Sequence, residues 1–427
     1  MTSRNQKSLT ALVSFFIVTL IVQTAHAEMR FVQIEAKDKF SRSAIADLGV
    51  AIEGVRSDSV WALVDEPTLE RLKKSSHRLM GDFNAEVSLA GFPPQDSRYH
   101  TYVQNSAALK DLQGRNADIT RVVSIGKSLE GRDIWAIHIN TNPDALRDSA
   151  SQKPGAVFMG NHHAREHLSV EVPLMLAQYL LNHREDAQVA TMLDTRDIWI
   201  IPMINPDGAE YDISGGKYKY WRKNRRDNKD GTFGVDLNRN YGFKWGTGGS
   251  SNDGSSDVFM GPAPFSEPET AAVRDFVSGH TNLKMLLTFH SFSELVLYPW
   301  GHTYDSIGNA KDFAVFKKMA DTMAGWNHYT PEQSSGLYIA SGDTTDWAYG
   351  ERGIFAFTFE LSPQNQFSGG GFYPGAAMID KAFNDNLKPC LYMLDLADDP
   401  YRATGTVPSG GLKNYVAPGL IPGSVLQ

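Results

Sequence analysis

The order of apolar and helical segments is the feature that most limits the fold of this chain. Between Tyr99 and Asp395, short apolar runs alternate with longer stretches whose apolar residues recur at helical spacing. The apolar runs lie at 135–139, 157–159, 198–204, 284–289 and 354–359, and helical stretches lie between them, for example at 170–181 and 268–277. We therefore expect an α/β domain with a mixed, largely parallel sheet that is flanked by helices.

The region before this domain has a different pattern. Residues 29–83 read as strand, helix, strand, strand, helix, strand, which predicts a small α+β domain of the ferredoxin-like type. Residues 84–97 contain Gly91 and Pro93-Pro94 without a clear period, as is typical of a linker. A small domain before such a linker indicates a propeptide that is cut away on activation; a permanently attached domain is the alternative.

The N-terminus has the pattern of a secretory signal peptide. Arg4 and Lys7 precede an apolar run from Leu9 to Val22, and Ala25-His26-Ala27 supplies a small-x-small cleavage site. An uncleaved membrane anchor is the alternative, although the run is short against the roughly 20 residues that span a bilayer. We expect an exported protein, secreted or periplasmic, with no membrane contact after signal removal.

These patterns divide the chain into a signal peptide (1–27), a propeptide domain (28–90), a main domain (91–398) and a flexible C-terminal tail (399–427) rich in proline, glycine and small polar residues. Cys390 is the only cysteine, so no intrachain disulfide can form, and its apolar helical setting predicts a buried thiol. The formal net charge of −8 argues against nucleic acid as the main partner.

Polar residues that bind metals or transfer protons follow three of the apolar runs. The run at 157–159 leads to His163 and Glu166, the run at 284–289 leads to His290, and the run at 354–359 ends on Glu360. Ligands of α/β sheets bind beyond the carboxyl ends of the strands, so these residues are expected to meet at one edge. We assign a zinc ion to His163, Glu166 and His290, with Glu360 as the carboxylate beside the fourth position. His162 and His167 are rival ligands that spacing does not exclude, but we expect them to support the site or to lie at the surface.

Two clusters between the second and third ligands suit an anionic substrate. Residues 220–226 place four positive charges in a short span, and residues 234–240 combine Asn238 and Arg239 with Asp236. Arginine binds a carboxylate through two parallel hydrogen bonds. A basic cluster such as 220–226 is usually just a solvated surface. Beside a zinc site, the alternative is that it binds a substrate with a terminal carboxylate.

Seven segments in this order carry a family resemblance that extends from about Tyr99 to Leu396: HHAREH, NPDG, YWRKNR, GVDLNRNYG, TFHSFSELVLYPWG, LYIASGDTTDW and FAFTFEL. They resemble zinc metallocarboxypeptidases of the carboxypeptidase A type, and within that type bacterial carboxypeptidase T. The resemblance implies the carboxypeptidase-like form of the α/β fold and a hydrolase that is a metalloprotease made as a zymogen. Its expected partners are peptide or protein C-termini and an activating protease, and a monomer is expected.

The resemblance also implies a role for each matching residue. The zinc ligands are His163, Glu166 and His290; Glu360 is the general base; Arg222 stabilises the oxyanion; Asn238 and Arg239 grip the terminal carboxylate; Tyr338 closes over the bound end; Arg165 is an accessory substrate-binding residue; and Asp236 orients the first histidine. Nonproline cis peptide bonds are implied at Ser291-Phe292 and Pro299-Trp300. The pocket for the terminal side chain is implied to include Gly301, Asp343 and Thr345, from which we expect broad specificity with an apolar or aromatic preference.

Two other functions fit the same scaffold. A zinc amidase that acts on peptidoglycan stem peptides would share the zinc site and Glu360, but the strong match of YWRKNR and LYIASGDTTDW argues against it. A non-catalytic peptide-binding module would be expected to lack a ligand or the base, and here all of them are present.

Overall fold

The computed structural model describes residues 30–55, 57–84, 92, 97–148, 151–214, 218–366 and 370–405. The expected signal peptide, most of the linker and most of the tail lie outside these residues, so the boundaries placed there remain predictions. Among the residues in these ranges, no helix is long and apolar enough to cross a membrane.

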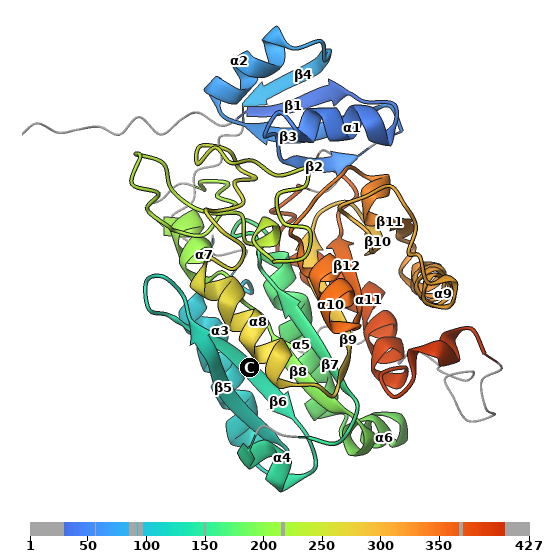
Figure 1. The fold of residues 1–427 in the computed structure, drawn as a ribbon. Coiled ribbons are helices and arrows are strands. Elements are labelled where there is room, and N and C mark those ends of the chain that lie inside the picture. The colour runs from blue at the N-terminus through green and yellow to red at the C-terminus, as the bar shows by residue number, and fades with distance from the viewer. Residues whose placement is uncertain are drawn as a thin grey trace, which may run out of the picture.

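The main domain is built on an eight-stranded mixed sheet (Figure 1) with the strand order β11-β10-β12-β9-β7-β8-β6-β5. The strands are β5 (Thr120–Lys127), β6 (Asp133–Ile139), β7 (Gly155–Gly160), β8 (Asp197–Ile201), β9 (Leu283–Ser291), β10 (Leu295–Tyr298), β11 (Thr330–Gln333) and β12 (Phe355–Leu361). The central strands β12, β9, β7 and β8 are parallel, whereas β10 on β12, β6 on β8 and β5 on β6 are antiparallel. The expected mixed, largely parallel sheet is confirmed.

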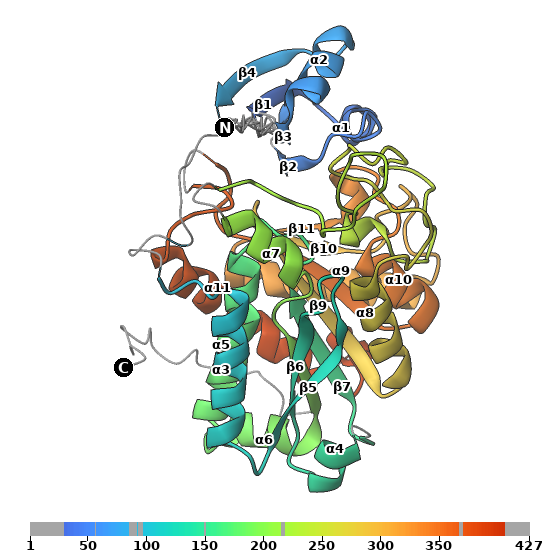
Figure 2. The same ribbon diagram turned by 90° about the vertical axis from the view of Figure 1, so that its left-hand side faces the viewer.

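Helices cover both faces of this sheet (Figure 2). One face packs against α3 (Tyr102–Arg115), α5 (Leu168–Asn182), α9 (Ala310–Asn327) and α11 (Ala377–Asp395), and the other against α8 (Pro268–Gly279) and α10 (Thr344–Arg352). The shorter helices are α4 (Pro143–Asp148), α6 (Ala187–Thr195) and α7 (Pro206–Ile213), and the 3-10 turns are η3 (Leu237–Arg239), η4 (Ser334–Gly336) and η5 (Pro400–Ala403).

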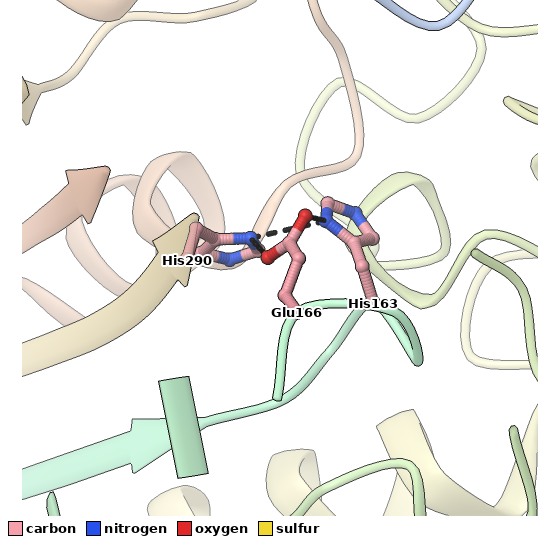
Figure 3. Close-up of side chains that lie close together, drawn as sticks. All are labelled: His163, Glu166 and His290. Carbon is pink, nitrogen blue, oxygen red and sulfur yellow. Dashed lines mark hydrogen bonds and ion pairs between the residues drawn. The ribbon is translucent and has the colours of Figure 1, made fainter. Parts of the chain in front are cut away.

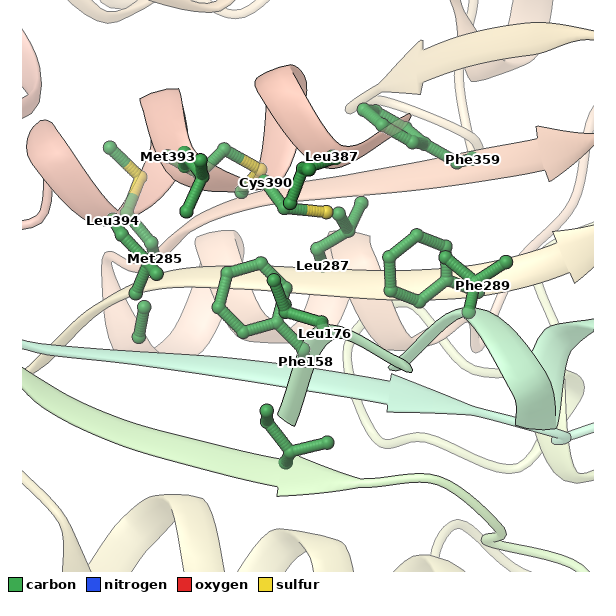
Figure 4. Packing of buried hydrophobic residues seen from close by; sticks show 14 of the residues in the cluster. Phe158, Leu176, Met285, Leu287, Phe289, Phe359, Leu387, Cys390, Met393 and Leu394 are labelled. Atoms are coloured by element: carbon green, nitrogen blue, oxygen red, sulfur yellow. The ribbon is translucent and has the colours of Figure 1, made fainter. Parts of the chain in front are cut away.

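Alternate residues of the central strands supply the two cores. Met285, Leu287 and Phe289 of β9 face α5 and α11, where Cys390 is buried among them (Figure 4), while Leu286 packs in the core on the opposite face. This period of two is what a strand that is buried on both faces requires. The predicted burial of Cys390 is confirmed, and burial raises the pKa of its thiol.

The N-terminal domain is a second, separate sheet with two helices, as expected. Its elements are β1 (Arg30–Glu35), α1 (Lys39–Ala46), β2 (Ile52–Val55), β3 (Ser59–Val64), α2 (Glu66–Lys74) and β4 (Leu79–Asn84), and the strand order is β2-β3-β1-β4. Asp65 caps α2 by accepting a hydrogen bond from the Thr68 backbone, with Pro67 in the first turn. Figures 1 and 2 show this domain above the irregular loops of the main domain.

Some elements differ from the sequence-based expectation. The edge strand β11 has the sequence Thr-Pro-Glu-Gln, which has no alternating apolar pattern and was not predicted as a strand. It is a strand because it pairs with β10. Residues 400–403, which lie in the segment expected to be a flexible tail, form the 3-10 turn η5. Where the tail begins stays a prediction. The hydroxyl of Tyr401 holds this turn by donating to Asp312 of α9 at 2.6 Å.

Candidate active site

The sheet register brings three strand ends together at one edge. Gly160 at the end of β7 pairs with Phe289 of β9, and Glu360 of β12 pairs with His290 of β9. The loop after β7 carries His163 and Glu166. The expected convergence at the carboxyl ends of the strands is therefore confirmed.

The turn after β7 is shaped by Gly160 and Asn161. A Cβ atom at Gly160 would lie 1.9 Å from the carbonyl oxygen of Ser169, so only glycine lets the end of the strand approach α5 so closely. Asn161 has a φ of 59°, a left-handed conformation that asparagine tolerates better than most residues. Its side chain donates to the His163 carbonyl at 3.1 Å, which closes the turn that carries His163.

His163, Glu166 and His290 place their donor atoms against one another (Figure 3). Nδ1 of His163 lies 2.6 Å from one oxygen of Glu166, Nδ1 of His290 lies 3.0 Å from the other, and the two Nδ1 atoms are 3.1 Å apart. All three side chains are buried. Burial alone would raise the pKa of Glu166, but the two imidazoles hold it below its usual range. Burial lowers the pKa of His290, which favours the neutral imidazole that binds metals.

Asp236 joins this cluster to Arg222. One oxygen lies 3.2 Å from Nε2 of His163, and the other accepts from Nε of Arg222 at 3.0 Å. Burial opposes ionisation of Asp236, yet Arg222 and His163 hold its pKa well below the ordinary value. A carboxylate on Nε2 leaves Nδ1 of His163 as the metal-binding nitrogen. Two imidazole nitrogens and a carboxylate with this support fit a zinc ion.

The rival histidines are engaged elsewhere. Nε2 of His162 contacts Tyr241 and Thr344, and its Nδ1 contacts Thr288. Nε2 of His167 lies 3.0 Å from Asp212. Both histidines are buried, so a surface position for either is wrong. That they do not bind the metal stays a prediction, which these partners support.

One pocket gathers most of the residues singled out in the sequence. Its lining includes His163, Glu166, Arg222, Asn238, Arg239, Tyr338 and Glu360, together with Gly301, Asp343 and Thr345. His290 lies beside it through Glu166. The cis peptide bonds expected at Ser291-Phe292 and Pro299-Trp300 are present.

Arg165 is the exception, because the structure buries it outside this lining. Its Nη1 donates to the Tyr220 carbonyl at 2.9 Å and to Asp257 at 3.2 Å, and its guanidinium lies over the ring of Phe372. Phe372 belongs to a buried apolar cluster that also contains Phe31 of the N-terminal domain. The expected role of Arg165 in substrate binding therefore stays a prediction.

Sequence reasoning missed two contributions to the pocket. Ile52, Gly54 and Val55 of β2 line it, although nothing in their sequence indicates a site. Thr344, which is buried behind the lining, bonds to Asn238, and the only signal for it was its place in the segment LYIASGDTTDW.

Comparison with known proteins agrees with this geometry. A profile of the zinc carboxypeptidase family matches residues 106–389. The chain is 33% identical over 371 residues to a zinc carboxypeptidase of Saccharothrix mutabilis subsp. capreolus, covering 81% of this chain and 84% of that protein. It is 28% identical over 396 residues to rat carboxypeptidase A2, covering 91% of this chain and 84% of that protein. The crystal structure of carboxypeptidase A from Helicoverpa armigera superimposes with a TM-score of 0.72 at 25% identity, covering 90% of this chain and all of that one. The chain belongs to the zinc carboxypeptidase family, and it is a zinc-dependent peptidase.

Proposed function

We propose that this enzyme removes single residues from the C-termini of peptides and proteins. We also propose that it is of the bacterial carboxypeptidase T kind and has a broad specificity. The observation that supports this activity is one pocket whose lining combines His163 and Glu166 of the zinc site with Glu360, Asn238 and Arg239. A free substrate carboxylate satisfies those donors, whereas an internal peptide bond would leave them buried without a partner, which is costly.

Each residue has a distinct part in this proposal. When bound by His163, Glu166 and His290, zinc supplies a Lewis acid that polarises the scissile carbonyl and acidifies a water molecule. Glu360 accepts the proton of the attacking water and later gives it to the leaving amine. Arg222, which Asp236 holds at 3.0 Å, donates to the carbonyl oxygen as its negative charge develops. Tyr338 closes over the terminal residue of the substrate. Arg165 contacts substrate residues that precede the scissile bond, once the N-terminal domain has been removed.

Mass spectrometry of defined peptides tests this function. We expect stepwise loss of C-terminal residues from peptides with free C-termini, and no loss from the same peptides after amidation or in the presence of a zinc chelator. A γ-linked muropeptide is the comparison substrate. Cleavage of only the muropeptide would reassign the enzyme to cell-wall chemistry, and no cleavage by a zinc-loaded, processed sample would support a binding module.

We further propose that the enzyme is exported as a zymogen, with the N-terminal domain as its inhibitory propeptide. Arg42 of α1 donates to the carbonyls of Gly336 and Leu337 at 2.6 Å each, and Ser43 accepts from the Ile339 backbone at 2.8 Å. These contacts flank Tyr338, whose hydroxyl reaches the Ile52 carbonyl at 3.5 Å. The segment that carries Tyr338 is thus held by the domain that lines the pocket. The signal pattern supports export to the periplasm or the medium, and the family resemblance supports a monomer.

The pocket for the terminal side chain has space at Gly301 and a buried carboxyl group, that of Asp343. Oδ1 of Asp343 accepts from Thr345 and from the Asp346 backbone, while Oδ2 is buried with no hydrogen-bond partner among the described residues. A Cβ at Gly301 would lie 3.0 Å from Oδ2, so glycine there keeps the carboxylate accessible from the pocket. Burial and the neighbouring Asp346 raise the pKa of Asp343 to about 7.

We expect this carboxyl to make the side-chain preference depend on pH. Below about pH 7 Asp343 is protonated and the pocket favours apolar and aromatic ends; above it the ionised form also accepts Arg or Lys. The ratio of kcat/KM for C-terminal Arg over Phe should rise about tenfold between pH 6 and 8. Asp343→Asn should abolish this rise while cleavage of Phe remains. A ratio that is independent of pH in the unmodified enzyme would contradict the assignment, and a ratio far above one throughout would exclude the apolar preference.

A further inference from the structure

We propose that Thr344 is a positioning residue that fixes which end of the Asn238 amide faces the substrate carboxylate. This inference rests on the proposed exopeptidase function, because it concerns the residue pair that grips the substrate end. It follows from the hydrogen bonds around Asn238, which lie behind the pocket wall.

The amide oxygen of Asn238 has two donors, both from Thr344. The Thr344 backbone N–H donates to Oδ1 at 3.0 Å and its hydroxyl donates to the same atom at 2.9 Å. A backbone N–H can only donate, so the atom that faces it must be the oxygen. The NH2 group of the planar amide therefore lies on the other branch, and the Asn238 side chain lines the pocket.

This orientation has the polarity that a carboxylate requires. An ionised carboxylate only accepts hydrogen bonds, so it needs the NH2 group of Asn238. In a flipped amide the oxygen would face the substrate carboxylate, so two acceptors would meet. Its NH2 group would face the Thr344 N–H, so two donors would meet. Thr344 thus excludes the non-binding orientation.

The hydroxyl of Thr344 is itself held in place. Because it donates to Asn238, it acts as acceptor toward Nε2 of His162, which lies 3.1 Å away and also contacts the Tyr241 hydroxyl at 2.8 Å. Nδ1 of His162 then accepts from the Thr288 hydroxyl at 3.1 Å. Thr344, His162, Tyr241 and Thr288 have no solvent exposure, so no water competes for these bonds.

The start of α10 fixes the position of the second donor, the Thr344 backbone N–H. Thr344 is the first residue of this helix, where backbone N–H groups have no partner within the helix. The Asp343 side chain caps the N–H groups of Thr345 and Asp346, and Asn238 takes that of Thr344. The same helix end therefore supplies the wall of the side-chain pocket and the support of the carboxylate grip.

Kinetics of Thr344→Val in the full chain, after proteolytic activation, test the inference. Valine keeps the shape and the backbone N–H but removes the hydroxyl, so we expect KM for a free C-terminal peptide to rise about tenfold with kcat within twofold. Thr344→Ala should behave in the same way, and Thr344→Ser should restore KM. In an Asn238→Ala background, Thr344→Val should add no further increase.

Two inhibitors separate positioning from general damage. The carboxylate 3-phenylpropionate should bind Thr344→Val about tenfold more weakly, whereas acetohydroxamate, which needs only the metal, should bind equally well. Unchanged KM in the valine and alanine variants, or an equal effect in the Asn238→Ala background, would overturn the inference. Weaker binding of acetohydroxamate would do so as well, since it would show a disturbed metal site. If the unmodified enzyme does not cleave residues from free C-termini, the proposed function is wrong. If it does, and the Thr344 variants have the same KM, only this inference is wrong.

Discussion

Replacement of Glu360 by glutamine is expected to lower kcat by about 10³- to 10⁴-fold, with bound zinc retained and KM nearly unchanged. Glutamine has the same shape but cannot accept the proton of the attacking water. Glu360 is not among the converging metal ligands His163, Glu166 and His290, so the metal should stay bound. The loss therefore falls on the proton transfer and on kcat.

Three measurements on Glu360→Gln check this expectation: steady-state kinetics on one peptide, the zinc content by atomic absorption, and the affinity for 3-phenylpropionate. Glu185→Gln is the matched control, because it makes the same change at a side chain that is 92% exposed. A variant that keeps its zinc and retains more than a tenth of kcat would exclude Glu360 as the general base. Loss of zinc would instead place Glu360 among the ligands.

Release of the N-terminal domain is expected to raise kcat/KM on the order of 100-fold. A domain that is closed over the pocket in 99 of 100 molecules reduces the apparent affinity by that factor. The closed form is supported by Arg42 on the carbonyls of Gly336 and Leu337 and by β2 in the pocket lining. Limited proteolysis in the linker at 84–97, followed over time by mass and by activity, measures the effect.

A point variant of the uncut chain gives an independent check. Arg42→Ala removes two hydrogen bonds from a charged donor and should raise the activity of the intact chain several-fold. Arg78→Ala, at an exposed position in the same domain, should leave it unchanged. An intact chain that is as active as the processed one would show that the domain is a permanent part of the enzyme rather than an inhibitor.

Part of the site could be predicted because it depends on residues that are neighbours in the sequence. Three of the buried strand runs lead to side chains that bind metals or transfer protons. Parallel strands bring their carboxyl ends to one edge, so His163, Glu166, His290 and Glu360 were expected to meet. Arg165 lies outside the pocket lining in the observed state, and its guanidinium lies over the ring of Phe372. No pattern around Arg165 records that contact.

The sequence by itself determined the two sheet types and the chemistry of the donors, because strand and helix periods and side-chain functional groups are properties of neighbouring residues. The tertiary structure alone decided which nitrogen of His163 faces Asp236, which end of the Asn238 amide faces the pocket, and that β2 lines it. Asn238 and Thr344 are more than 100 positions apart, as are Gly54 and His163, so packing of distant segments sets their distance. Hydrogen-bond direction then follows from which donor arrives beside which acceptor.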